Sequence, residues 1–226
     1  MIDLSIIFLT VNRVPKKWAE YHKKVLLEAT RDYPIISVSR KPVDMPGINL
    51  IQREPISASN IYKQMLRAAK IAKTPYVAIA EDDSLYPLEH FIYFRPKANE
   101  FAYNMCRWAV FTWGTPTYFW RNRISNLTLI APRELLIKAL EVRFAKYPNG
   151  TPDDRTGELG KDKTERLLRL PVNNMVQFFT TTPIVNFNHI KALDPREQNM
   201  RKRMAPLRAF DIPYWGKADK LVTNFK

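Results

Sequence analysis

Residues 76–83 read Tyr-Val-Ala-Ile-Ala-Glu-Asp-Asp, a short apolar run followed directly by the carboxylates Glu81, Asp82 and Asp83. The run predicts a buried β-strand, so the acids follow its carboxyl end, where open α/β sheets place their ligand crevices. Adjacent carboxylates repel one another unless a cation, hydrogen bonds or solvent offset the repulsion, and hard divalent ions prefer oxygen ligands. The segment therefore predicts a metal site. An acidic turn without a ligand is the alternative, because such triplets are common.

The chain before this segment alternates between strand-like and helix-like patterns. Residues 4–11 form a β-rich apolar run, apolar positions at helical spacing follow in 16–31, and 33–39 return to a β pattern. After a Pro- and Gly-containing loop over 41–55, Ser57 or Ser59 caps a helix with a buried stripe of Ile61, Met65, Ala68, Ala69 and Ala72. This order predicts an α/β fold in which helices flank a mixed, mostly parallel central sheet.

The second half of the chain is more varied. Residues 108–113, 127–131 and 176–187 predict strands, and 132–146 predicts a helix with Pro at its first turn. Residues 149–163 are polar and predict a loop, whereas the basic segment 194–208 favours a helix. No internal repeat or linker divides the 226 residues, of which 46% are hydrophobic, so we expect a single domain.

The composition indicates which binding partners and which cellular compartment to expect. The chain has 36 Lys and Arg against 22 Asp and Glu, and its net charge of +14 predicts attraction to polyanions, nucleic acid first. A solvated basic surface without a partner is the alternative. The apolar runs are too short to cross a bilayer and the N-terminus lacks secretory-signal features, so we expect a cytoplasmic protein without a membrane span. The single cysteine, Cys106, lies in an aromatic stretch and is expected to act as a small hydrophobe.

The order of elements over about residues 4–115, closed by the acidic triplet, resembles the nucleotide-binding half of GT-A glycosyltransferases. The resemblance implies a Rossmann-like GT-A domain that transfers a hexosyl or pentosyl group from a nucleotide-diphosphate sugar, here a UDP-sugar, to an acceptor hydroxyl. About residues 1–115 would hold the donor and about 116–226 the acceptor. Asp83 would bind Mn²⁺ or Mg²⁺ and Glu81 the donor ribose. Asp82 suits either role, because this run has three acids where the family has Asp-x-Asp.

Further donor-site residues follow from the same resemblance. Positions that contact the nucleotide in the family match Thr10, Asn12, Arg13 and Asn60, which are otherwise ordinary loop or capping residues. Family members often take a late histidine as a metal ligand. His189 is our candidate because imidazole suits Mn²⁺ and it ends a β-like run; a structural role is the alternative. His22 is expected on a surface helix.

The catalytic base is expected in the polar loop. An inverting enzyme needs a carboxylate within hydrogen-bond reach of the acceptor hydroxyl, and we select Asp154 over Asp153 and Glu158. A retaining enzyme would need no such base.

Two groups of residues predict the acceptor site. The first interleaves aromatic rings, which stack on bases or sugars, with guanidinium groups: Trp113, Tyr118, Trp120, Arg121 and Arg123. Trp108 and Phe111 are assigned to the core instead. The second lies in the basic segment and suits a phosphate backbone: Arg201, Lys202 and Arg203. A solvated charged helix is the alternative for this second group.

The acceptor itself is expected to be DNA. The small size and segment 81–91 resemble bacteriophage-type glycosyltransferases that modify 5-hydroxymethylated pyrimidines in the host cytoplasm. One alternative is a cell-envelope or capsule saccharide acceptor, with the basic segment on anionic lipid. Another is a non-enzymatic basic nucleic-acid-binding module in which the acidic turn is incidental.

Overall fold

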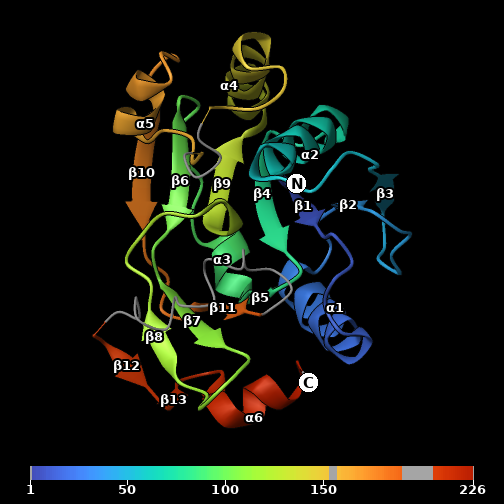
Figure 1. The fold of residues 1–226 in the computed structure, drawn as a ribbon, viewed down its shortest axis with the longest axis vertical. Helices are drawn as coiled ribbons and strands as arrows, with labels where there is room; N and C mark the ends of the chain where they lie inside the picture. Colours follow the sequence, from blue (N-terminus) through green and yellow to red (C-terminus); the bar gives the residue numbers. More distant parts are fainter. Residues whose placement is uncertain (1, 153–156, 190–205, 226) are drawn as a thin grey trace.

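A mixed seven-stranded sheet organises the computed structural model, which describes residues 2–152, 157–189 and 206–225. Its strands are β1 (Leu4–Leu9), β2 (Ile35–Ser39), β3 (Ile48–Ile51), β4 (Tyr76–Glu81), β6 (Glu100–Asn104), β9 (Leu129–Pro132) and β10 (Asn174–Phe178). They lie in the order β10-β6-β9-β4-β1-β2-β3 (Figure 1). Within this sheet β9 runs antiparallel to its neighbours β4 and β6, and the other pairs are parallel. The predicted fold class, a mostly parallel sheet flanked by helices, is confirmed.

Helices cover both faces of this sheet. α2 (Ala58–Ile71) and α4 (Arg133–Lys146) pack on one face, and α1 (Lys16–Thr30) and α3 (Leu88–Ile92) on the other (Figure 1). The stripe predicted on α2 is confirmed: Met65, Ala68, Ala69 and Ala72 are buried and Ile61 packs against them. Ser57 is the cap, since its side chain accepts the backbone N–H of Asn60. The helix therefore starts where its first free N–H group finds an acceptor.

A second, five-stranded sheet lies beyond the carboxyl ends of the first. It consists of β5 (Ser84–Leu85), β7 (Arg107–Phe111), β8 (Tyr118–Trp120), β11 (Ile184–Asn188) and β12 (Arg208–Ala209), in the order β12-β8-β7-β11-β5. One of its faces packs against α1 and α6 (Ala218–Thr223) in a shared apolar cluster. A hairpin of β13 (Asp211–Ile212) and β14 (Gly216–Lys217), the helix α5 (Asp162–Leu167) and a 3-10 turn (Asn126–Thr128) complete the described elements.

Several sequence expectations change at this level. The strand predicted over 176–187 is two strands in different sheets, β10 and β11, which the turn Thr180–Pro183 separates. The predicted loop 41–55 contains β3, which extends the parallel sheet beside β2. Strands from both sides of residue 115 enter both sheets, so the expected donor and acceptor halves interleave in space. Residues 194–205 of the basic segment lie outside the described residues, and Arg208 begins β12.

None of the helices in the described ranges combines the length and apolar character required to cross a membrane.

Candidate functional site

The acidic triplet lies at the point where the order of the parallel sheet reverses. The chain proceeds from β1 to β2 and β3 on one side and then returns with β4 on the other side of β1. Such a switch point leaves a crevice outside the carboxyl ends of the two central strands. Leu9 pairs with Glu81 there, and the Thr10 hydroxyl donates a hydrogen bond to the Asp82 carboxylate. The acids therefore meet the residues that follow β1.

Two side chains of α1 fix the backbone of this acid turn. The Trp18 Nε1–H donates to the carbonyl of Asp82 at 2.6 Å. His22 Nε2 lies 3.1 Å from the carbonyl of Glu81 and 3.0 Å from that of Ser84. Both partners are acceptors, so Nε2 carries the proton. Burial lowers the pKa of His22 to about 4, so the ring is neutral at pH 7.

The expected surface position of His22 is therefore wrong. The residue is 2% exposed, and its ring stacks on Phe8 with centroids 5.4 Å apart. The apolar residues at helical spacing in α1 include Trp18, which is fully buried. His22 follows Trp18 by four residues and so lies on the same face of the helix. That spacing was the signal in the sequence that could have placed it.

We expect Trp18→Phe to weaken the acid turn, because the aromatic ring is kept and the hydrogen bond to the Asp82 carbonyl is lost. The free energy of unfolding should fall by about 1–3 kcal/mol, the cost of leaving a buried acceptor unsatisfied. Urea unfolding measures this loss. Trp108→Phe, which alters a partly buried tryptophan of the same apolar cluster, is the control. Equal losses of stability in the two variants would contradict the role given to Trp18.

The carboxylate of Asp83 is oriented from β5 and β11. Its Oδ1 accepts hydrogen bonds from Ser84 Oγ at 3.0 Å and from Asn186 Nδ2 at 3.2 Å. Its Oδ2 lies 4.0 Å from Nε2 of His189, and the two side chains are 16% and 6% exposed. The structure thus brings together Asp83 and His189, which are 106 residues apart, and adds Asn186, which the sequence reasoning missed.

Burial raises the pKa of all three carboxylates. Burial, together with the charges of Asp83 and Asp82, raises the pKa of Glu81 to about 8. Burial and the charge of Asp83 raise the pKa of Asp82 to about 7, although the Thr10 hydrogen bond opposes the shift. Burial raises the pKa of Asp83 to about 6, against its hydrogen bonds and the charge of Arg107. A cation at the turn would relieve this repulsion.

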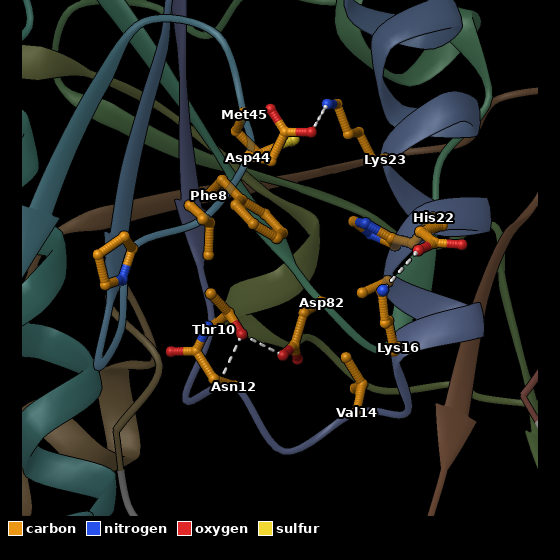
Figure 2. A pocket seen from close by; sticks show the side chains of 14 residues that line it. Phe8, Thr10, Asn12, Val14, Lys16, His22, Lys23, Asp44, Met45 and Asp82 are labelled. Atoms are coloured by element: carbon orange, nitrogen blue, oxygen red, sulfur yellow. Dashed lines mark hydrogen bonds and ion pairs between the residues drawn. The ribbon is translucent and has the colours of Figure 1, made fainter.

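A cavity of about 430 Å³ opens beside the turn (Figure 2). Asp82 and Thr10 lie at one end, and the ion pair of Lys23 with Asp44, at 2.6 Å, joins α1 to the 42–45 loop at the other (Figure 2). The volume falls in the range of about 300–1,000 Å³ that small-molecule sites occupy. The lining residues are Phe8, Thr10, Asn12, Val14, Lys16, Ala19, Glu20, His22, Lys23, Pro42, Val43, Asp44, Met45 and Asp82.

Of the residues predicted to contact the donor, Thr10, Asn12 and Asp82 line this cavity, and Arg13, Asn60 and Glu81 do not. Glu81 lies in register with Leu9, whose side chain faces α2, whereas Phe8 of the cavity faces α1. Asp82 is therefore the member of the triplet that faces the cavity. Asn60 is 4% exposed, and its Nδ2 donates to Oε1 of Gln52 at 2.8 Å.

Asn12 shapes the mouth of the cavity. Its φ of 56° lies in the left-handed region, which asparagine tolerates better than most residues. Its side-chain oxygen accepts the backbone N–H groups of Arg40 and Lys41, both at 2.9 Å. The loop after β2 is thus tied to the loop after β1. The sequence identified Asn12 but gave no indication of these partners.

The residues predicted for the acceptor divide into three groups. Tyr118 is fully buried in the cluster between the second sheet and α6, so its predicted place on an acceptor surface is wrong. Trp113, Trp120 and Arg121 are partly buried, and Arg123 is exposed. Phe111 is 2% exposed and Trp108 packs against the same core as Tyr118, as predicted. Arg201, Lys202, Arg203 and the predicted base Asp154 lie outside the described residues.

The polar loop is anchored beside the start of α2. A Cβ at Gly157 would collide with the Tyr62 hydroxyl, and one at Gly150 with the Ser59 side chain. The buried Arg143 guanidinium lies over the Tyr62 ring and donates from Nη2 to the carbonyl of Gly157 at 2.8 Å. Gly150 and Gly157 therefore lie against α2, and Gly157 is also held by α4.

Within the ranges that the structure describes, no cluster of three or more His, Cys, Asp or Glu side chains has the geometry of a closed metal site. Asp83 and His189 remain as two candidate ligands. A Mg²⁺-type ion commonly takes one or two protein carboxylates and completes its shell with water and substrate phosphates. The chemistry of this pair fits an ion shared with a phosphate-bearing substrate.

Comparison with known proteins gives likenesses in fold. No protein-family model matches the sequence, and no curated protein sequence matches it. A glycosyltransferase involved in the glycosylation of the major capsid of PBCV-1 is similar at 12% identity and a TM-score of 0.47, over 90% of this chain and 100% of that one. S. aureus TarS 1-349 in complex with UDP-GlcNAc is similar at 13% identity and a TM-score of 0.47, over 83% of this chain and 59% of that one.

A third likeness is to the bifunctional IspDF from Campylobacter jejuni, at 14% identity and a TM-score of 0.44, over 79% of this chain. The chain spans 50% of the length of that protein.

Proposed function

We propose that the protein is a metal-dependent glycosyltransferase that moves a sugar from a nucleotide diphosphate to an acceptor hydroxyl. One observation carries the proposal. At the switch point of a parallel sheet, Asp82 forms the wall of a 430 Å³ cavity while Asp83, the next residue, faces His189 at 4.0 Å. Two consecutive residues of one turn thus belong to a cavity of the size of a nucleoside and to a candidate cation site for its phosphates.

The cavity is assigned to the nucleoside of the donor. Phe8 and His22 give it a stacked aromatic wall suited to a base, and Asp82 supplies an acceptor for ribose hydroxyls. The sequence resemblance placed Glu81 in that role. We assign it to Asp82, because Glu81 does not line the cavity.

The cation is assigned to Asp83 and His189. When bound, Mn²⁺ or Mg²⁺ supplies Lewis-acid stabilisation of the charge that develops on the leaving diphosphate. Ser84 and Asn186 hold Asp83 Oδ1 and thereby direct Oδ2 toward His189. This orientation leaves Oδ2 of Asp83 and Nε2 of His189 as the atoms that would hold the ion.

In the transfer, the acceptor oxygen forms a bond to the anomeric carbon as the bond from that carbon to the diphosphate oxygen breaks. The nucleoside diphosphate leaves with the electron pair, and the acceptor proton passes to a base. Asp154 stays our prediction for this base in an inverting reaction. The proposal is supported by the described residues on either side of it, because Gly150 and Gly157 lie against Ser59 and Tyr62 at the start of α2.

DNA with 5-hydroxymethylated pyrimidines stays our proposal for the acceptor. The net charge of +14 and the cationic and aromatic residues Trp113, Trp120, Arg121 and Arg123 support it. Transfer of labelled sugar from a panel of UDP-sugars to hydroxymethylated DNA, unmodified DNA and a lipid-linked saccharide tests it. Transfer to the lipid-linked saccharide alone would refute DNA as the acceptor and favour a cell-envelope saccharide.

We expect Ala19→Trp to abolish nucleotide binding, because the new indole would fill the cavity from an exposed position of α1. Titration of UDP in the presence of Mn²⁺ should give a dissociation constant at least about 100-fold higher, since about 3 kcal/mol of contacts are excluded. Ala145→Trp, at an exposed position of α4, should bind UDP as the original protein does. Unchanged UDP binding by Ala19→Trp would show that the nucleoside does not bind in this cavity.

A further inference from the structure

A group of opposite charge lies in the same sheet as the strand that follows the acid turn, because only β11 separates β7, which begins at Arg107, from β5. Trp108 pairs with Trp120 and Ala109 with Phe119 across the antiparallel strands β7 and β8, so Arg107 lies opposite Arg121. The N–H of Arg121 donates to the carbonyl of Arg107 at 3.0 Å, which confirms this register. Directly opposite side chains of an antiparallel pair share a face of the sheet. Arg107 and Arg121 therefore leave the second sheet on one side, and with Arg123 they form what we call the arginine group.

Burial makes this arrangement costly. Arg107 is 2% exposed, its Nη2 donates to the carbonyl of Arg123 at 3.0 Å, and its Nε has no hydrogen-bond partner. Burial and the charges of Arg121 and Arg123 lower the pKa of Arg107 to about 9. Like charges directly opposite one another destabilise a sheet, and a buried charge without a full set of partners costs more. An anion at this face would remove both penalties.

The acidic groups that act on Arg107 are Glu81 and Asp83. In the proposed function Asp83 holds a cation, so its charge is not available to the arginine group during the reaction. The arginine group also extends outward from the buried Arg107, since Arg121 is partly buried over the Phe119 ring and Arg123 is exposed. A ligand can thus approach from solvent and reach a guanidinium group next to the acid turn.

We propose that the arginine group is an acceptor subsite that binds an anionic group, a phosphate or a carboxylate, on the acceptor molecule. This inference rests on the proposed function, which places the reacting bond at Asp83. Guanidinium groups bind phosphate and carboxylate through paired, charge-assisted hydrogen bonds, so three of them select an anionic acceptor over a neutral one. The subsite would hold that anion while the hydroxyl meets the donor sugar at the turn.

Calorimetric titration with glucose 6-phosphate and with glucose tests the subsite, with the protein saturated in Mn²⁺ and UDP so that the donor site is filled. We expect glucose 6-phosphate to bind about 10–100-fold more tightly than glucose, the effect of one or two charge-assisted hydrogen bonds. The Arg121→Met, Arg123→Met double variant should lose that advantage, because methionine keeps apolar packing without the charge. Arg166→Met, at an exposed position of α5, is the matched control and should retain it.

Two results would overturn the subsite: no advantage of glucose 6-phosphate over glucose, or an advantage that persists in the double variant. A loss of UDP affinity in the double variant, with its preference for glucose 6-phosphate intact, would assign the arginine group to the donor and also refute the inference. Failure of the proposed function is a separate outcome. If the protein binds glucose 6-phosphate through these arginines but binds no UDP or UDP-sugar, the anion site stands and the proposed glycosyltransferase function is refuted.

Discussion

Asp83→Asn should abolish Mn²⁺-dependent cleavage of a UDP-sugar. The asparagine oxygen can still accept from Ser84 and Asn186, so the turn keeps its hydrogen bonds, but the charge that holds the cation is lost. Loss of metal stabilisation of the leaving diphosphate is worth several kcal/mol, which corresponds to a fall in rate of about a thousandfold or more. Release of UDP, measured with and without Mn²⁺, checks the result.

The control for this substitution is Asp162→Asn, which removes an exposed carboxylate of α5 that pairs with Arg166. It should leave cleavage within about twofold of the original rate, because surface ion pairs contribute little. The cleavage rate of His189→Gln should lie between those of Asp83→Asn and Asp162→Asn, since this substitution removes one of the two proposed ligands. Full activity of Asp83→Asn would refute the proposed site, and cleavage unaffected by removal of the cation would refute metal dependence.

The same substitution should stabilise the protein when no metal is present. The pKa values of Glu81, Asp82 and Asp83 are raised to about 8, 7 and 6, so the folded protein holds these protons more tightly than the unfolded chain does. Their contribution to stability is fully present below about pH 4 and is lost as the pH rises through 6 to 8. The metal-free protein should therefore unfold more easily at pH 8.5 than at pH 6.5.

Asp83→Asn removes one of the buried negative charges. It should therefore reduce the loss of folding stability of the metal-free protein by about 1–3 kcal/mol at pH 8.5. Thermal unfolding in EDTA at the two pH values gives the measurement. The range above pH 6.5 is chosen to exclude an effect of His22 and His90. Burial lowers the pKa of both residues, so their protonation destabilises the fold only when the pH falls below the pKa of free histidine.

The exposed Asp219→Asn is the control for stability and should follow the pH profile of the original protein. Saturating Mn²⁺ with UDP should raise the unfolding temperature of the original protein at pH 8.5 and have a smaller effect on Asp83→Asn. A metal-free protein whose stability is constant or rises between pH 6.5 and 8.5 would contradict the picture of three acids in repulsion.

The local patterns of the sequence determined many of the elements around the proposed donor site. Period-two and period-3.6 spacing depends on neighbouring residues only, so the strand before Glu81, the helix of Met65 and the order of the other elements up to β4, apart from β3, were predictable. The resemblance assigned Thr10 and Asp82 to one donor site, and the structure brings the two into contact because the carboxyl ends of adjacent parallel strands lie at the same edge of a sheet.

Other features depended on which face of an element is covered by a distant part of the chain. Alternation places Tyr118 and Trp120 on one face of β8, yet only the packing of α6 shows that Tyr118 is in the core. His22 likewise turned out to be buried because the acid turn lies against α1. Periodicity assigns residues to a face, but the burial of that face is decided by segments far away in sequence.

The sequence by itself thus determined the α/β class, the position of the acids at a strand end and the net charge. Only the tertiary structure decided that Asp82 faces the cavity, that Asn186 orients Asp83 and that Arg107 adjoins the acid turn. These contacts join residues about 25 to 105 positions apart. They arise from the pairing of β4 with β1 for Asp82 and from the order of β5, β7 and β11 for Asn186 and Arg107, and this register is set by the complete fold and not by any local pattern.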